Sequence, residues 1–113
     1  MELKSAADQY LNDCFERESS PHVNELASNV GIDRVAFSRR FRAETGIAAS
    51  CYLKQAQIAR AMELLRTTDL PTNAIAYASA FGSRVTFFRT FKRLTGLSPH
   101  GYRSAPADEL HKM

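Results

Sequence analysis

The chain of 113 residues contains no apolar run that approaches the ~18 residues needed to cross a bilayer. Its first residues, MELKSAADQY, also lack the apolar core of a secretion signal. These two absences argue against a membrane protein and predict a cytoplasmic one. With 44% hydrophobic and 24% charged residues, the composition is typical of a folded protein, and the length suits one domain.

Cysteine and histidine are scarce. Cys14 and Cys51 lie far apart, and neither has a second cysteine or a histidine at the spacing of a metal site. We therefore expect two reduced thiols, no metal and no cofactor. No nucleophile with a base and no glycine-rich phosphate loop accompanies His22, His100 or His111, so an enzyme is not expected.

The sequence also lacks any sustained alternation of apolar and polar residues, so strands are not expected. Helical spacing of apolar residues runs through almost the whole chain and predicts an all-α fold. Asp33 and Ser83 are suitable N-caps for two helices that Gly46 and Gly96 would end. The expected helices cover residues 5–16, 24–29, 34–44, 49–66 and 84–94, a short helix capped by Thr72 or Asn73 and ending at Ala80, and a last turn opened by Ser98 and Pro99.

Acidic residues are missing from a long part of the chain, with none between Asp69 and Asp108. Residues 34–107 carry twelve basic and three acidic residues, a net charge of +9, whereas residues 1–33 carry seven acids and two bases, a net charge of −5. This asymmetry favours a polyanion partner, most often nucleic acid. A basic face that is merely solvated is the alternative.

What the sequence does contain is a repeat. The stretch RVAFSRRFRAETG, residues 34–46, returns as RVTFFRTFKRLTG at residues 84–96, and Tyr52 and Tyr102 keep the same spacing. Each copy joins a short helix, a turn and a longer helix, as ELASNVGIDRVAFSRRF and AIAYASAFGSRVTFFRTF, with one extra residue in the second turn. Two copies fit a pair of helix-turn-helix units better than a solenoid, which normally needs more repeats.

Each repeated helix has an apolar and a polar face. Phe37 and Phe41, and likewise Phe87 and Phe91, fall together on a helical wheel and would anchor the helices in a core. The opposite faces carry Val35, Ser38, Arg39 and Arg42 in the first helix and Val85, Phe88, Arg89 and Lys92 in the second. Arginine can bond a guanine, and valine or phenylalanine can meet a thymine methyl. Phe88 could contact a base, fold back into the core or seal an interface.

The expected organisation is a helix with the first helix-turn-helix unit (1–48), a linker helix (49–68), the second unit (69–104) and a flexible tail (105–113). The apolar face of the linker is formed by Tyr52, Leu53, Ala56, Ala59, Leu64 and Leu65. About 18 linker residues give a length of roughly 27 Å, against ~34 Å for one turn of B-DNA. A single chain could then place two recognition helices in successive major grooves and bind an asymmetric site as a monomer.

The second copy, AFGSRVTFFRTFKRLTGLSPHGYR, resembles the signature of the AraC/XylS family of bacterial transcription regulators. The residues that match are Phe81, Phe87, Arg89, Phe91, Lys92, Gly96, Pro99, Tyr102 and Arg103. The likeness covers residues 20–103, and the length is that of members without an effector domain. It implies two helix-turn-helix subdomains joined by a linker helix, monomeric binding to double-stranded promoter DNA, and usually activation through contact with RNA polymerase.

By this resemblance, groove contacts fall on Val35, Ser38 and Arg39 in the first unit and on Arg84, Val85, Thr86, Phe88 and Arg89 in the second. With the residues suited to phosphates, the candidate DNA-binding set is Arg34, Val35, Ser38, Arg39, Arg42, Arg84, Val85, Thr86, Phe88, Arg89, Lys92 and Arg93. Three positions depart from the family pattern: Ala49 replaces a proline, Gln57 a basic residue and Ala80 a glycine. A module of the same fold that binds protein and not DNA is the alternative function. The sequence leaves open whether the chain is a complete regulator or part of a longer one, and which promoter it controls.

Overall fold

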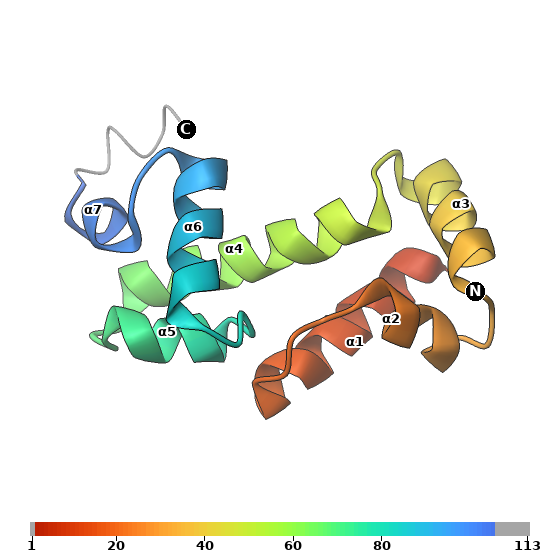
Figure 1. Ribbon diagram of the computed structural model, residues 1–113, viewed down its shortest axis with the longest axis horizontal. Helices are drawn as coiled ribbons and strands as arrows, with labels where there is room; N and C mark the ends of the chain where they lie inside the picture. Colours follow the sequence, from red (N-terminus) through yellow and green to blue (C-terminus); the bar gives the residue numbers. More distant parts are fainter. Residues whose placement is uncertain (1, 106–113) are drawn as a thin grey trace.

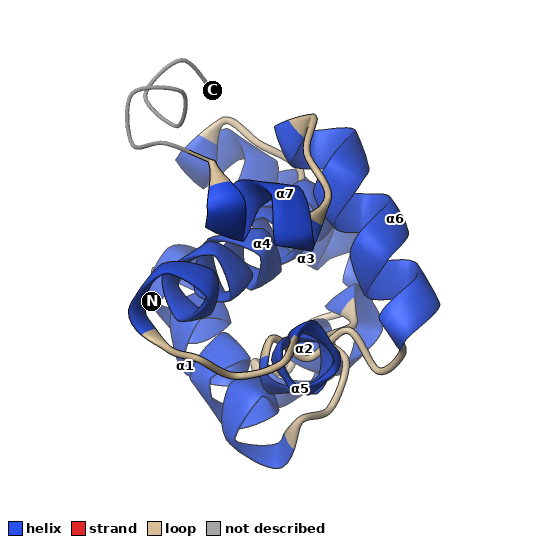
Figure 2. Ribbon diagram, turned by 90° about the vertical axis from the view of Figure 1, so that its left-hand side faces the viewer, coloured by secondary structure: helices blue, strands red, loops and turns tan. Residues whose placement is uncertain are grey.

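The computed structural model describes residues 2–105, which form seven α-helices and no strand, so the predicted all-α fold is confirmed (Figure 2). The helices are α1 (Leu3–Arg17), α2 (Val23–Asn29), α3 (Arg34–Thr45), α4 (Ala49–Thr67), α5 (Thr72–Ala78), α6 (Arg84–Thr95) and α7 (Pro99–Ser104). Within this described part, none of the helices combines the length and apolar character needed to cross a membrane. The tail expected to be flexible lies, from residue 106 on, outside the described residues.

All the expected helices are present, but the prediction was wrong about one helix end, one N-cap and one residue of an apolar face. The short helix α5 ends at Ala78, because the chain turns sharply at Ala80. Its N-cap position is Pro71, so neither Thr72 nor Asn73 caps it. Ala59 is exposed and does not belong to the apolar face of the linker helix, which Gln57 and Ile58 enter instead.

Two hydrophobic cores lie at the two ends of α4 (Figure 1). The first is formed by α1, α2, α3 and the start of α4, together with Ala80 from the turn after α5. The second is formed by the rest of α4 with α5, α6 and α7. We name these groups the first unit and the second unit. Because α4 contributes buried residues to both, from Leu53 to Leu65, it joins the units and is part of each.

The repeated aromatic residues build the same cluster in each unit. Phe37 stacks on Phe41 with ring centroids 5.8 Å apart, and Tyr52 meets Phe41 edge-on at 5.3 Å. In the second unit the Phe87–Phe91 and Phe91–Tyr102 distances are 5.7 and 5.5 Å. All four phenylalanines of these clusters are fully buried, as expected from the helical wheel.

The repeated Thr-Gly pair ends α3 in the first unit and α6 in the second. Gly46 and Gly96 adopt φ of 84° and 82°, a left-handed conformation that favours glycine. The Thr45 hydroxyl donates to the Phe41 carbonyl at 2.8 Å, and the Thr95 hydroxyl donates to the Phe91 carbonyl at 2.8 Å. The repetition of the Thr-Gly pair is therefore explained by folding alone.

The turns of the two units are equivalent, although their sequences differ. Gly31 and Ala80 occupy the same place, since the residue after each donates its N–H five residues back, Ile32 to the Ala27 carbonyl and Phe81 to the Ala76 carbonyl. The extra residue of the second turn is thus Gly82. Ala80 adopts φ of 64°, so the departure from glycine leaves the turn in its left-handed form at some cost in strain.

That strain leads to a prediction for Ala80→Gly. Relief of the left-handed alanine, ~1–2 kcal/mol, offsets the loss of one buried methyl group, ~0.8 kcal/mol, and the added freedom of the unfolded chain, ~0.5 kcal/mol. We expect the free energy of unfolding to change by less than about 1 kcal/mol. The matched control is Ala76→Gly, equally buried but in helix α5, which should cost about 2 kcal/mol in urea denaturation. Equal losses in both variants would contradict the strain at Ala80.

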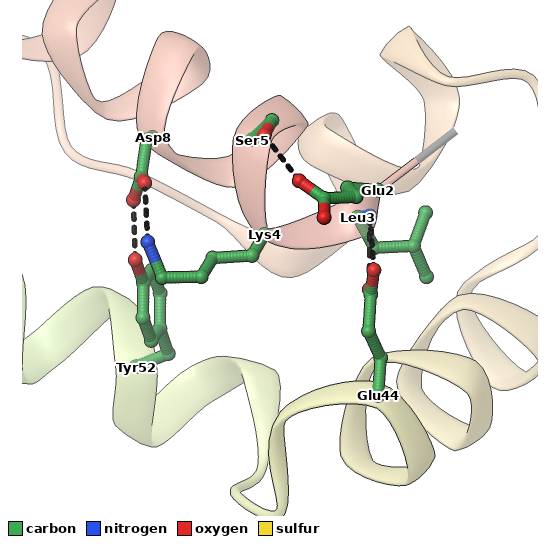
Figure 3. A network of polar contacts seen from close by, with 7 residues as sticks. All are labelled: Glu2, Leu3, Lys4, Ser5, Asp8, Glu44 and Tyr52. Atoms are coloured by element: carbon green, nitrogen blue, oxygen red, sulfur yellow. Dashed lines mark hydrogen bonds and ion pairs between the residues drawn. The ribbon is translucent and has the colours of Figure 1, made fainter.

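Polar contacts hold helix α1 against α3 and α4 within the first unit (Figure 3). The Glu44 carboxylate on α3 accepts the Leu3 N–H, at 2.9 Å to one of its oxygens, where the helix N-terminus favours a negative charge. Asp8 accepts hydrogen bonds from the Lys4 ammonium at 3.0 Å and from the Tyr52 hydroxyl. Burial raises the pKa of the Tyr52 phenol, and its hydrogen bond to Asp8 raises it further. Asp8 is therefore part of the packing of α1 on α4.

Candidate nucleic-acid interface

Helix α3 buries its aromatic face and exposes the predicted polar one. The Asp33 carboxylate caps the helix by accepting the Ala36 N–H at 3.0 Å. Phe37 and Phe41 are fully buried, whereas Val35 is 66% exposed. Three further candidates of this helix are exposed, namely Arg34, Arg39 and Arg42, and Ser38 is half-buried. These side chains lie together on the solvent side of one helix.

Helix α6 repeats this arrangement. The Ser83 hydroxyl accepts the Thr86 N–H at 3.1 Å and caps the helix. Val85 is 64% exposed, almost the same fraction as Val35. The other exposed candidates are Arg84, Thr86, Arg89, Lys92 and Arg93. The structure therefore presents two recognition helices with matching valine and arginine positions on the solvent side.

Phe88 is intermediate between the roles that were left open for it. Its ring is half-buried and meets Phe87 edge-on, with centroids 5.6 Å apart. The guanidinium of Arg84 lies 5.0 Å from the centroid of the same ring. Phe88 thus packs against the second core and makes a cation–π contact with Arg84. The rest of its ring is exposed on α6.

The basic residues of the two recognition helices are not engaged by acidic ones. Across residues 2–105 the ion pair between side chains is Lys4 with Asp8, both on α1. Exposed arginines with no carboxylate partner keep all their N–H donors available. Such donors fit phosphate oxygens and guanine edges, which accept two parallel hydrogen bonds from one guanidinium.

Repeated residues that folding does not explain are the strongest local indication of function. Three pairs are identical in the two copies although all six residues are exposed: Arg34 and Arg84, Val35 and Val85, and Arg39 and Arg89. Exposed valines of this kind add nothing to a core. Packing therefore does not account for the repetition of these exposed residues.

The dimensions of the molecule are comparable to one turn of B-DNA. Figure 1 shows α3 and α6 at opposite ends of α4, both crossing its direction. Helix α4 has 19 residues, which at 1.5 Å per residue make it about 28 Å long. The longest dimension of the molecule is 43 Å. One turn of B-DNA is ~34 Å, so two helices on one chain of this size can face successive major grooves.

Two basic residues outside the candidate set lie on or near this surface. Lys54 on α4 is half-buried, with its ammonium 5.8 Å from the centroid of the Phe81 ring. It lines, with Arg34, a hollow of about 210 Å³ between α2, α3 and α4. Arg40 on α3 is exposed, but its counterpart Thr90 is buried. The repeat could not indicate either residue, because neither is repeated.

The side chains that a metal site would use within residues 2–105 are the histidines, cysteines and carboxylates. No three His, Cys, Asp or Glu residues among those described could hold a metal ion together. Cys14 is a buried free thiol, whose pKa is raised by its burial, and Cys51 is an exposed one. His111 lies outside the described residues.

Comparison with known proteins identifies the family. A family model described as a helix-turn-helix domain matches residues 26–105. A putative AraC-like transcription regulator of Streptomyces antibioticus is 34% identical over 84 residues, 74% of this chain and 28% of the relative. The arabinose operon regulatory protein of Escherichia coli strain K12 is 28% identical over 105 residues, 93% of this chain and 36% of the relative.

A solved structure shares the fold as well. The DNA-binding domain of AdpA, described as a global transcriptional factor in complex with a target DNA, is 30% identical. It superimposes with a TM-score of 0.76 over 87% of this chain and 89% of that domain. This chain spans only 28% and 36% of the two relatives above, so it corresponds to one part of them. The chain belongs to the helix-turn-helix domain family and has the AraC-type form of that domain, with two helix-turn-helix motifs.

Proposed function

We propose that this protein binds a specific site in double-stranded DNA and regulates bacterial transcription from it. Helices α3 and α6 enter successive major grooves on one face of the duplex. The observation that carries this proposal is the pair of exposed and identical Val-Arg surfaces at the two ends of α4, which have no acidic partner among residues 2–105. The complex of the related AdpA domain with its target DNA supports it.

The candidate residues divide into two roles. Arg39 and Arg89 bond guanine edges, and Val35 and Val85 contact thymine methyl groups. Ser38, Thr86 and the exposed edge of Phe88 complete the base contacts. Arg84 also lies in the groove, as the family resemblance implies. The remaining basic residues of the candidate set bind phosphates and so position the protein without selecting sequence: Arg34, Arg42, Lys92 and Arg93.

The assembly follows from the same proposal. One chain contacts both half-sites, so the protein acts as a monomer on an asymmetric site, in the cytoplasm. In this proposal residues 1–48 bind one half-site, residues 69–104 bind the other, and the linker helix 49–68 connects them. Transcription is activated through contact with RNA polymerase, as the family resemblance implies.

The experiment that tests the function is selection of bound sequences from a random pool of duplexes. The expected product is one asymmetric sequence with two preferred segments, protected as a single footprint. Enrichment of no sequence, with binding that depends on duplex length alone, would contradict the proposal. Absence of binding to any duplex would favour the alternative, a helix-turn-helix fold that serves protein interaction.

Substitution of the matched arginines should affect each half-site separately. We expect Arg39→Ala or Arg89→Ala to weaken specific binding by ~1–3 kcal/mol and to relax the base preference only in its own half of the site. Binding of the variants is measured by fluorescence anisotropy on the selected site and on duplexes mutated in either half. Equal loss on every duplex would assign these arginines to phosphates.

The acidic helix α1 is expected to lie outside the DNA interface, since carboxylates near phosphates would oppose binding. Asp13→Asn with Glu16→Gln, both at exposed positions, should leave the selected sequence unchanged. Asp8 is left intact in this test, because it bonds Tyr52 and its loss would disturb the packing of α1. A shift in the preferred bases, measured by repeating the selection, would place α1 at the DNA.

A further inference from the structure

A buried polar side chain joins the linker helix to the turn of the second unit. Gln57 on α4 is 3% exposed. Its Nε2 donates to the Ala80 carbonyl at 2.9 Å and to the Ser79 carbonyl at 3.3 Å. Carbonyls at the end of a helix have no partner within it, and a buried amide without a partner is costly. Gln57 thus satisfies the end of α5 and holds the second turn against α4.

The same turn also contacts the first unit. Ala80 is buried in the first core, whereas its neighbour Phe81 is buried in the second. At Gly82, an added Cβ would lie 2.9 Å from the Ser20 hydroxyl oxygen, in the segment between α1 and α2. Residues 79–82 are therefore in contact with both units at once, and Gly82 permits a close approach that a side chain would prevent.

These contacts limit how the two units can move relative to each other. Helix α4 by itself fixes the distance between the two cores. Without further contacts, however, the turn at residues 79–82 could still change its orientation relative to α4. The hydrogen bonds of Gln57 and the contact of Gly82 with Ser20 hold this turn on both sides. The angle between α3 and α6 is then set before DNA is bound.

We propose that Gln57 is the positioning residue that sets the spacing between the two half-sites, acting together with the Gly82–Ser20 contact. This inference rests on the proposed function, in which both units bind one DNA site. Adding one base pair moves a half-site by ~3.4 Å along the duplex and rotates it by ~35°. A rigid pair of units discriminates against such a change, and a loosened pair accepts it.

The test measures affinity by fluorescence anisotropy for the selected site and for sites with one base pair added or removed between the half-sites. The protein should prefer its own spacing by about tenfold. Gln57→Leu has a similar volume but no donor, and we expect its preference to fall below about threefold while its affinity for each isolated half-site is unchanged. The matched control is Gln55→Leu, at an exposed position of the same helix, which should keep the full preference.

A second pair of variants approaches the junction from the other side. Gly82→Ala places a methyl group against Ser20 and strains a backbone with φ of 76°, so it should also reduce the spacing preference. Ser20→Ala in the same chain removes the opposing oxygen and should restore part of it, so a mere loss of folding is distinguished by rescue. If Gln57→Leu folds and keeps the tenfold preference, or if Gly82→Ala does, the inference is wrong. If the parent protein itself binds no two-part site, the proposed function fails instead.

Discussion

Phe87→Ala is expected to destabilise the second unit by about 3–5 kcal/mol, which is the usual cost of removing a fully buried phenylalanine. Its ring lies between three others, with centroid distances of 5.3 Å to Phe81, 5.6 Å to Phe88 and 5.7 Å to Phe91. A domain of this size has a total stability of only ~5–15 kcal/mol. DNA binding should therefore be lost because the second unit unfolds.

The matched control is Val85→Ala, two residues earlier in the same helix and 64% exposed. Because the Val85 methyl groups face the solvent, this variant should melt like the parent protein. It should still lose affinity for one half-site, because the proposed contact with a thymine methyl group is removed. Thermal melting followed by circular dichroism separates the two variants. A Phe87→Ala variant that melts like the parent would reverse the assignment of this residue to the core.

The same variant also tests whether the units fold independently. The two cores are distinct, but α4 and the junction at Gln57 connect them. Hydrogen exchange of backbone amides should show protection lost in residues 69–104 and largely kept in 1–48. Loss of protection in both would mean that the contacts across α4 make the chain a single cooperative unit.

Helix positions were predictable from the sequence because their signals are local. Asp33 and Ser83 cap α3 and α6 through bonds that span three residues, and Gly46 and Gly96 end both helices. The exposed face of each recognition helix follows from the position of its buried phenylalanines. For this reason the repeat alone placed Val35 and Arg39 on the solvent side.

Features that depend on contacts between distant segments were not predictable. An alanine gives no indication of positive φ, and Ala80 adopts it because the turn around it is fixed by hydrogen bonds and by packing in the first core. Gln57 looks like a surface residue in the sequence, but it is buried because its partners come from residues more than twenty positions away. The half-buried position of Phe88 likewise depends on Phe87 and Arg84 together.

Insertion of ~5 base pairs between the half-sites is expected to abolish high-affinity binding, because it turns one half-site to the far side of the duplex. Only one unit can then bind its groove, and the advantage of linking two units, about 10²–10³-fold in affinity, is lost. The measurement is a titration by fluorescence anisotropy, with stoichiometry from analytical ultracentrifugation, on the selected site and on the spaced variants.

An insertion of ~10 base pairs separates a rigid linker from a flexible one. It returns both half-sites to the same face of the duplex but moves them a further ~34 Å apart. A chain whose longest dimension is 43 Å and whose recognition helices are fixed at the ends of α4 cannot span that distance. Affinity should therefore remain low at both insertions, with one protein bound per site in the parent complex. Recovery of affinity at the ~10 base-pair insertion would mean that the connection between the units is flexible. Two chains bound to the parent site would mean that the protein acts as a dimer in which each chain contributes one recognition helix.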